Sequence, residues 1–267
     1  MTFLVISILV GCLSVMTARG RQGNWPSGMP VTRPRLVAAG GTYAGRRGRP
    51  TDAYVIQERL VAVAHGANGE PACTAAALAL GAVVAARPQY QQDLDECAQL
   101  AHRAVRTAAL RDASAHRAAG TAGVRDASAP ELVSTLDVVV LEPGERPRLR
   151  FVHVGDGAIW HCPKGGAPQP LTTPHSFAEA GQEGRLLRGL GLPSALNPEA
   201  GSVPLRPGDR VVIVSDGVVR ALGAARMKEL FTDGASPGAC LDRLYDEMAA
   251  AEPEDDATVI IADYVTA

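Results

Sequence analysis

The chain has 267 residues, of which 46% are hydrophobic and 20% are charged, and its formal net charge is -2. At about 150 residues per domain this length allows one large domain or two small ones, and the composition is that of a globular protein and not of a disordered or fibrous one. Because Lys and Arg are not in excess and only 4% of the residues are aromatic, we expect no nucleic-acid partner.

The chain contains five cysteines without a Cys-x-x-Cys pair: Cys12, Cys73, Cys97, Cys162 and Cys240. An odd number of cysteines at wide spacing fits neither a disulfide framework nor a structural zinc site. We therefore interpret them as small buried hydrophobic residues and expect a reducing, cytoplasmic location.

The first residues form an apolar segment, Phe3 to Val15, which is shorter than the roughly 20 residues that a membrane-spanning helix needs. A signal peptide begins with positive charge, whereas the first positive residue here is Arg19. Three interpretations stay open: an uncleaved membrane anchor, a signal sequence, and a start at Met16 or Met29. We favour the later start or a dispensable tail, and we expect a flexible lead-in over residues 17–35, which are rich in Gly, Pro and Arg.

The first half of the regular pattern predicts a hairpin followed by two helices. Apolar runs at Ala53–Ile56 and Leu60–Ala64 are separated by polar residues, as in a pair of buried strands. A Gly-rich turn leads to a predicted helix over Pro71–Val84, with Pro in its first turn. Apolar residues at helical spacing predict a second helix over Gln91–Arg111.

The second half of the pattern contains mostly strands and loops. It predicts strands over Thr135–Leu141, Leu149–Val154, Gly157–His161, Asp209–Val214 and Ala257–Tyr264, a helix over Pro237–Ala250 that begins at Ser236, and an irregular segment over residues 162–209 with short helical pieces around Phe177–Glu183. Strands and helices thus arrive in adjacent pairs, which favours antiparallel sheets covered by helices over a doubly wound parallel sheet. We expect one such domain over residues 36–267, preceded by a separate segment over residues 1–35.

Several aspartates stand at the ends of predicted strands: Asp52, Asp156, Asp216, Asp255 and Asp256. A buried strand that ends in Ser-Asp-Gly places its carboxylate at the rim of the sheet, where glycine allows a close approach to the backbone. Carboxylates that converge at such a rim form a hard oxygen site for Mg²⁺ or Mn²⁺. A single Asp-Gly pair is more often only a turn, so this prediction depends on the order and spacing of the motifs.

The order of these motifs resembles that of the metal-dependent protein phosphatases of type 2C. The family's opening Arg-x-x-Asn-Glu-Asp is similar to Arg47-Gly-Arg-Pro-Thr-Asp52, and its strand ending in Asp-Gly-x-Gly-Gly is similar to Val63-Ala-His-Gly-Ala-Asn-Gly69. Further family motifs have counterparts in the same order: Gly155-Asp-Gly157, Leu171-Thr-Thr-Pro-His-Ser176, Leu205-Arg-Pro-Gly-Asp209, Ser215-Asp-Gly217 and Asp255-Asp-Ala-Thr258.

The resemblance implies an α+β fold with four layers, α-β-β-α, in which two antiparallel sheets pack face to face and helices flank them. It also implies hydrolysis of phosphoserine or phosphothreonine on proteins with Mn²⁺ or Mg²⁺, which lowers the pKa of bound water and neutralises phosphoryl charge. By position, the family's metal ligands correspond to Asp52, His65, the Gly66 carbonyl, Asp156, Asp216 and Asp255, and its phosphate-binding arginine corresponds to Arg47.

Three positions depart from the family pattern, the first being Pro50, which stands where the family has Asn. His65 stands where the family has the aspartate that bridges both metals, and Thr51 stands where the family has Glu. A carboxylate has two oxygens and can bridge, whereas a neutral imidazole offers one lone pair and holds one metal. Three outcomes stay open: an inactive protein, a one-metal site that prefers Mn²⁺, Fe²⁺ or Zn²⁺, and an active site rebuilt with another residue, such as Asp256.

We therefore consider two main hypotheses, a metal-dependent serine/threonine phosphatase and a pseudophosphatase that binds phosphoproteins through the same groove. A third hypothesis is a membrane-linked sensor domain anchored by Phe3–Val15, the only segment that would contact a membrane. The expected partners are phosphorylated proteins, including a Ser/Thr kinase or its substrates, and the expected state is a monomer. Three further histidines, His153, His161 and His175, have no partner pattern in the sequence, and we expect them to be structural.

Overall fold

The computed structural model describes residues 33–48, 51–67, 72–118, 132–144, 146–176, 186–232 and 234–266. All of its helices and strands lie in the unit Pro34–Thr266. The strands are β1 (Pro34–Tyr43), β2 (Asp52–Ile56), β3 (Leu60–Ala67), β4 (Val133–Ser134), β5 (Leu136–Leu141), β6 (Arg148–Val154), β7 (Ala158–Cys162), β8 (Gln169–Pro170), β9 (Glu199–Pro204), β10 (Arg210–Val214) and β11 (Ala257–Thr266). The helices are α2 (Ala72–Ala86), α3 (Gln91–Ala118), α4 (Asp216–Thr232) and α5 (Pro237–Ala251).

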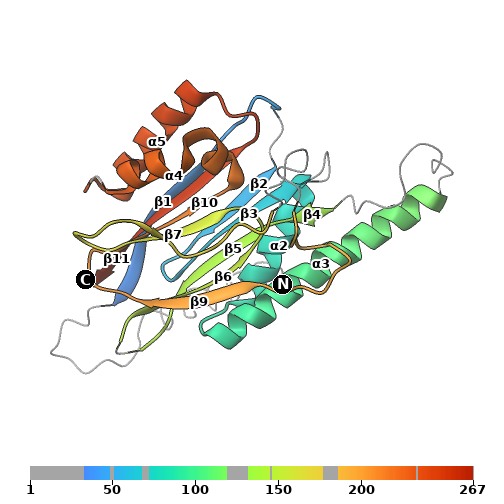
Figure 1. The fold of residues 1–267 in the computed structure, drawn as a ribbon. Coiled ribbons are helices and arrows are strands. Elements are labelled where there is room, and N and C mark those ends of the chain that lie inside the picture. Colours follow the sequence, from blue (N-terminus) through green and yellow to red (C-terminus); the bar gives the residue numbers. More distant parts are fainter. Residues whose placement is uncertain are drawn as a thin grey trace, which may run out of the picture. The chain divides into compact units, whose positions relative to one another are not determined.

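The strands form two antiparallel sheets (Figure 1). The first sheet has the order β1-β11-β10-β7-β8, and the second has the order β2-β3-β5-β6-β9, with β4 paired to β3. The last strand of the chain, β11, lies between β1 and β10, and it pairs with β1 from Pro34 opposite Thr266 to Tyr43 opposite Ala257. The first sheet therefore contains both the first and the last strand of this unit.

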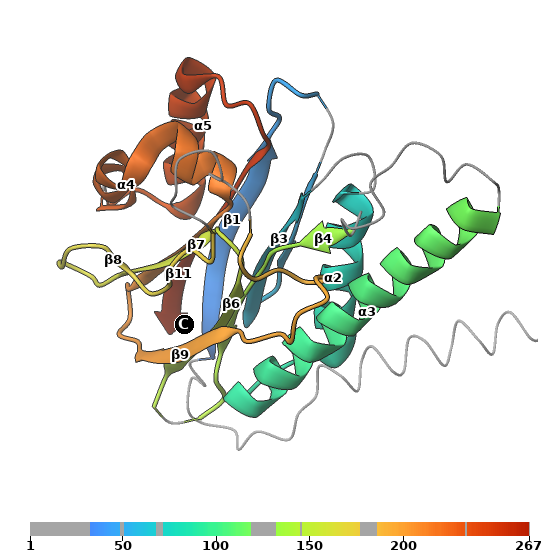
Figure 2. The same ribbon diagram turned by 45° about the vertical axis from the view of Figure 1, so that its right-hand side comes forward.

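The central strands are apolar at almost every position because both of their faces are buried. In β3, Val61 and Val63 face the layer between the sheets, whereas Ala62 and Ala64 face the helices α2 and α3. In the same way, the side chains of β10 alternately face the layer between the sheets and the helices α4 and α5. Figures 1 and 2 show one helix pair on each outer side of the two sheets. The predicted four-layer α+β sandwich is therefore confirmed.

Most of the predicted elements are present, with small changes at their ends. The expected hairpin is formed by β2 and β3, which pair antiparallel with Asp52 opposite His65. The second predicted helix continues past Arg111 to Ala118 as α3. The helix α5 begins after Ser236, whose side chain accepts a hydrogen bond from the N–H of Ala239.

Five elements were missed by the sequence prediction: β1, β9, α4 and the two-residue strands β4 and β8. The sequences of β1 and β9 contain glycine and alternate poorly, and pairing with β11 and β6 decides their extended conformation. The helix α4 contains Gly223 with φ 69° and ψ 163°, a kink that breaks the helical pattern. The irregular segment predicted over residues 162–209 is therefore corrected, because it contains β9 and the short strand β8.

Some predictions fall on parts of the chain outside the described residues, namely the apolar segment Phe3–Val15, the lead-in up to residue 32 and the short helical pieces around Phe177–Glu183. Of the helices that the structure describes, none combines the length and the apolar character needed to cross a membrane.

Candidate active site

Aspartates from separate segments of the chain meet around His65. Asp52 begins β2 and lies opposite His65 of β3, and Asp216 begins α4 directly after β10. Asp156 lies in the turn between β6 and β7, and Asp255 lies in the segment before β11. We call these four aspartates the acidic cluster.

The Ser-Asp-Gly motif fixes the start of α4 against the start of β11. The hydroxyl oxygen of Ser215 accepts a hydrogen bond from the N–H of Thr258 at 2.9 Å. A Cβ atom at Gly217 would lie 2.1 Å from the carbonyl oxygen of Asp256, so a larger residue has no room there. This close approach places Asp216 beside the segment that carries Asp255.

His65 is buried between two aspartates of the cluster. Its Nδ1 atom hydrogen-bonds with Oδ1 of Asp52, and its Nε2 atom lies 3.7 Å from Oδ1 of Asp216. Burial alone would lower the pKa of His65, but the hydrogen bond with Asp52 and the charge of Asp216 raise it to about 9. In this arrangement the imidazole is protonated at neutral pH, and it is a cation in the cluster without a free lone pair.

Arg220 is a second cation in the cluster, and the sequence did not single it out. Its Nη2 atom lies 2.5 Å from Oδ2 of Asp216 and 3.6 Å from Oδ2 of Asp156. Its Nη1 atom donates a hydrogen bond to Oδ2 of Asp255 at 3.2 Å. Asp216 and Arg220 stand four residues apart on α4, where side chains are neighbours, so a correct helix prediction would have pointed to this pair.

At Asp156 the nearby cations do not offset burial and the charge of Asp216. Burial and the charge of Asp216 raise the pKa of Asp156 to about 6, although Arg220 and His65 act in the opposite direction. Gly155, just before it, has φ 122°, a conformation that favours glycine and that shapes the turn. A further cation beside Asp156 would therefore be stabilised.

Arg47 stands at the solvent side of the cluster. Its Nη1 atom forms a short ion pair with Oδ1 of Asp255, and 69% of its side chain is exposed, compared with 12% for Asp255. The loop that carries Arg47 is held by Asp256, whose carboxylate accepts hydrogen bonds from the N–H groups of Gly45 and Thr51 at 3.1 and 2.7 Å. Asp256 thus anchors this loop to the segment before β11.

The donor set fits a divalent cation at the buried side of the cluster. From the residues that the structure describes, Oδ2 of Asp52 and Oδ1 of Asp216 receive no hydrogen bond although both atoms are buried. Buried acceptors without donors cost free energy, and carboxylate oxygens are the ligands that Mg²⁺ and Mn²⁺ prefer. These two oxygens are therefore candidate ligands for such a cation, and His65 cannot supply a carboxylate that bridges to a second one.

The structure brings together all of the side chains that the sequence analysis predicted for the site: Arg47, Asp52, His65, Asp156, Asp216 and Asp255. Gly66 follows His65 in β3, and its N–H donates to the carbonyl oxygen of Thr51 at 2.9 Å. The residue that sequence reasoning missed is Arg220.

His153, His161 and His175 have partners that no sequence pattern indicated. Each one lies beside a carboxylate: His153 beside Asp137 at 2.6 Å, His161 beside Asp209 at 3.2 Å and His175 beside Glu199 at 3.6 Å. These partners lie 16 to 48 residues away in the sequence, so no local spacing could have revealed them.

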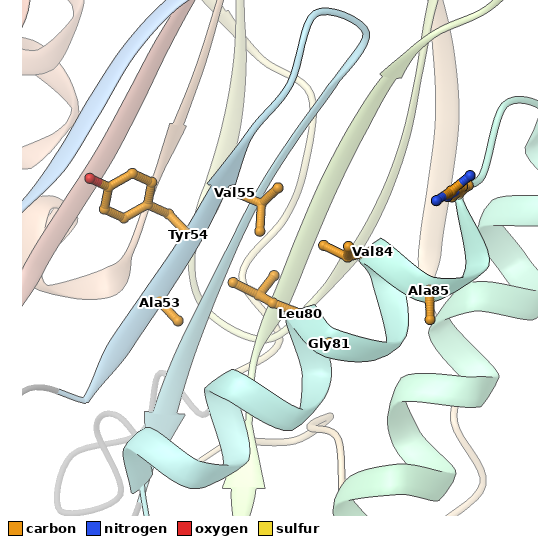
Figure 3. Close-up of a pocket in the computed structure, with 8 residues that line it drawn as sticks. Ala53, Tyr54, Val55, Leu80, Gly81, Val84 and Ala85 are labelled. Carbon is orange, nitrogen blue, oxygen red and sulfur yellow. The ribbon is translucent and has the colours of Figure 1, made fainter. Parts of the chain in front are cut away.

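A separate hollow of about 720 Å³ lies between β2 and α2 (Figure 3). Its lining includes Tyr54, Val55, Leu80 and Val84, with Arg87 at one side. None of the described residues that line it is acidic, so the hollow does not share the chemistry of the acidic cluster.

The protein phosphatase 2C family model matches residues 51–250 of the chain. No curated protein matches the chain at a significant level. The matched region includes β2, β3 and the start of α4, and with them Asp52, His65, Asp156 and Asp216.

Several solved structures with the same fold are bacterial phosphatases. The serine/threonine phosphatase PstP/Ppp of Mycobacterium tuberculosis is 19% identical, with a TM-score of 0.71 over 86% of this chain and 99% of that chain. The catalytic domain of PstP in complex with two manganese ions is 20% identical, with a TM-score of 0.70 over 87% and 100% of the two chains. The PPM Ser-Thr phosphatase MsPP of Mycobacterium smegmatis, solved with cacodylate, is 26% identical, with a TM-score of 0.68 over 86% and 98%. With a family model that spans most of its length, the chain belongs to the protein phosphatase 2C family.

Proposed function

We propose that the chain is a metal-dependent protein serine/threonine phosphatase that hydrolyses phosphoserine or phosphothreonine with Mn²⁺ or Mg²⁺. The observation that carries this proposal is the acidic cluster, in which four aspartates from separate segments gather within the fold of the family. Gathering like charges costs free energy unless cations neutralise them. Manganese was found with PstP, a phosphatase of the same fold.

In this proposal the metal is held by Asp52, Asp156 and Asp216, with Asp255 and the carbonyl oxygen of Gly66 as further oxygen ligands. Asp52 and Asp216 contribute the buried oxygens that accept no hydrogen bond from the described residues. A metal bound there would supply an acidified water and positive charge for the phosphoryl oxygens. His65 would become a ligand only after it releases its proton, so we expect one metal in place of two.

Arg47 is the proposed phosphate-binding residue. Its guanidinium is mostly exposed and lies on Asp255 at the rim of the cluster. A guanidinium can bind two oxygens of a phosphate at once, and the loop anchored by Asp256 keeps it beside the proposed metal ligands. Arg47 therefore orients the phosphorylated side chain toward the cluster.

The test is hydrolysis of a phosphothreonine peptide with added Mn²⁺. We expect the wild-type chain to release phosphate. We expect Asp216→Ala to lower the rate on the order of 100-fold, which is typical when a group that stabilises charge in the transition state is removed. Asp246→Ala on the exposed surface of α5 is the matched control and should leave the rate unchanged. Equal rates for the wild type and Asp216→Ala would contradict the proposal.

A second candidate function is a pseudophosphatase that binds phosphoproteins without hydrolysing them. The observation that favours it is the pair of internal cations, because together they already contact all four aspartates. Arg220 lies beside Asp156, Asp216 and Asp255, and His65 lies beside Asp52 and Asp216. In this case the wild-type chain binds the phosphopeptide but does not hydrolyse it with Mn²⁺, and His65→Asp restores hydrolysis by returning the bridging carboxylate.

The proposed partners are phosphorylated proteins, among them a Ser/Thr kinase or its substrates, and we propose that the chain acts as a monomer. We also propose that the phosphatase domain spans residues 36–267, separate from residues 1–35. Cys97, Cys162 and Cys240 are buried free thiols, which supports the proposal of a reducing, cytoplasmic location.

A further inference from the structure

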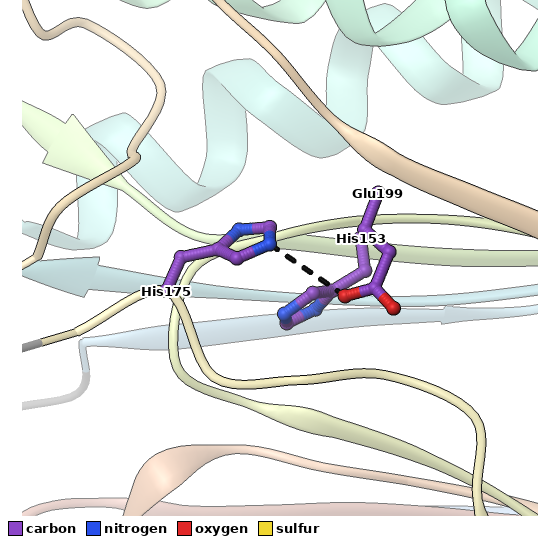
Figure 4. Close-up of side chains that lie close together, drawn as sticks. All are labelled: His153, His175 and Glu199. Atoms are coloured by element: carbon purple, nitrogen blue, oxygen red, sulfur yellow. Dashed lines mark ion pairs between the residues drawn. The ribbon is translucent and has the colours of Figure 1, made fainter.

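Two histidines and a glutamate form a second group of metal-binding side chains, which the phosphatase proposal does not use. His153 lies on β6, His175 lies after β8, and Glu199 begins β9. One ligand atom of each lies within 4.8 Å of the others, and Figure 4 shows the carboxylate close to both rings. Within the described part of the chain, no other three His, Cys, Asp or Glu side chains have this spacing.

The ring of His153 is oriented by a buried carboxylate. Its Nδ1 atom hydrogen-bonds with Oδ1 of Asp137 at 2.6 Å, and His153 and Asp137 are 0% and 1% exposed. The Nε2 atom is thereby directed to the other side, where it lies 3.2 Å from the carbonyl oxygen of Thr173. Metal-binding histidines are almost always held in this way through their second ring nitrogen.

His175 and Glu199 complete the group on its solvent side. The Nε2 atom of His175 lies 3.6 Å from Oε2 of Glu199, and the ring centroids of His175 and His153 are 4.6 Å apart. A metal binds a neutral imidazole, so the ion has to displace any proton on Nε2 of His153, which faces the carbonyl oxygen of Thr173.

An ion can reach this group from solvent. A hollow of about 430 Å³ is lined by His175, Glu199, Arg188 and Asn197. The exposed Arg188 places its Nη1 atom 3.3 Å from Nε2 of His175 and 3.2 Å from the carbonyl oxygen of Asn197. Because exposed polar contacts of this kind contribute little, the guanidinium can turn away when an ion enters.

We propose that His153, His175 and Glu199 bind a divalent transition metal, with Zn²⁺ as the preferred ion. Two imidazoles and one carboxylate suit a borderline-soft ion and leave a fourth position open, whereas the acidic cluster offers mainly hard oxygen ligands. Asp137 is the positioning residue of the site, because it contacts His153 and not the ion.

Binding at this site has a consequence for the acidic cluster. When Nε2 of His175 binds the ion, the remaining proton of the ring moves to Nδ1. In the structure, Nδ1 of His175 accepts a hydrogen bond from the N–H of Gly155 at 3.3 Å. This hydrogen bond would be lost when Nδ1 carries a proton. Because Gly155 would lose this hydrogen bond, we expect Zn²⁺ to shift its backbone amide signal in an NMR spectrum. Gly155 directly precedes Asp156 of the acidic cluster.

The test uses Co²⁺ as a visible probe for the Zn²⁺ site, on the full chain with Asp216→Asn to weaken metal binding at the acidic cluster. We expect one equivalent of Co²⁺ to give d–d absorption, and we expect Zn²⁺ to displace it. Adding Glu199→Gln or His175→Gln should abolish the absorption, and adding Asp137→Asn should weaken affinity about 10- to 100-fold. Arg188→Gln should tighten binding, because it removes the competing guanidinium.

Glu199→Gln and Arg188→Gln leave the core intact, because the Glu199 side chain is 31% exposed and Arg188 is exposed. Circular dichroism and thermal melting verify that each variant is folded. Absorption that persists in folded Glu199→Gln and His175→Gln, or the lack of any Co²⁺ absorption in the folded parent, would overturn the proposal. Neither result depends on phosphatase activity.

Discussion

The charge of a single side chain changes how far the negative charge of the acidic cluster is neutralised. In this chain His65 replaces a carboxylate of the family pattern, and between Asp52 and Asp216 it becomes a cation. Arg220 adds a second internal cation within reach of Asp156, Asp216 and Asp255. Positive charge supplied by the chain therefore competes with positive charge supplied by a metal.

This competition leads to a prediction for Arg220→Gln. Removing the guanidinium frees carboxylate oxygens of Asp156, Asp216 and Asp255, so we expect Mn²⁺ to bind roughly 10-fold more tightly, equivalent to about 1.4 kcal/mol. Isothermal titration calorimetry measures the affinity. Arg226→Gln is the matched control on the same helix, because Arg226 contacts Glu229 and Glu247 outside the cluster. Weaker Mn²⁺ binding by Arg220→Gln would show that Arg220 supports the site.

A second prediction at the residue scale concerns Asp209. Burial alone would raise the pKa of Asp209, but N–H groups of Lys164 and Arg206 and the ring of His161 donate to its carboxylate and lower the pKa below 3.8. A carboxylate whose pKa is lower in the folded state stabilises the fold above pH 3.8, and this contribution is lost as the pH falls through the folded-state pKa.

We therefore expect Asp209→Asn to lower the free energy of unfolding at pH 7 by about 1 to 3 kcal/mol, because an amide NH₂ would face N–H donors. The difference from the wild type should shrink when the pH falls below 3.8. Urea unfolding at both pH values measures it, with the exposed Asp246→Asn as control. A difference that stays constant with pH would refute the assigned role of the charge.

At the scale of elements, helix ends and amphipathic spacing could be predicted, whereas elements that depend on a partner could not. The Pro-containing start of α5 after Ser236 is a local signal, and the helix begins where it was expected. In contrast, β1 is extended because β11 pairs with it along its length. The kink at Gly223 hid α4, and with it the spacing that joins Asp216 and Arg220.

The cap of α5 gives a prediction at this scale. The hydroxyl oxygen of Ser236 accepts the N–H of Ala239 at 3.3 Å, so Ser236→Ala should lower the free energy of unfolding by about 1 kcal/mol in urea. Ser236→Asp is the matched control and should keep the stability, because its carboxylate can accept the same N–H and favours the positive end of the helix dipole. Equal loss in both variants would mean that the cap does not contribute.

At the scale of the whole molecule, the two sheets share one apolar layer, to which β3, β5, β6, β10 and β11 all contribute buried side chains. Ile213 of β10 is fully buried there, whereas Ile56 at the edge strand β2 is 38% exposed. We expect Ile213→Ala to lower the free energy of unfolding by about 2 to 5 kcal/mol, and Ile56→Ala to cost clearly less. Both sheets should still unfold in one transition, which far-ultraviolet circular dichroism and Trp160 fluorescence would monitor together.

The sequence by itself determined most of the central strands and three of the described helices, the family resemblance and the aspartates at the strand ends, because these depend on local periodicity and on short motifs. Only the tertiary structure decided which charges meet. Arg47 and Asp255 are 208 residues apart, and His65 and Asp52 are brought together by strand register. The pKa of a buried group depends on its neighbours in space, so the positive charge on His65 and the pairing of His153 with Asp137 could emerge only from the packed sheets.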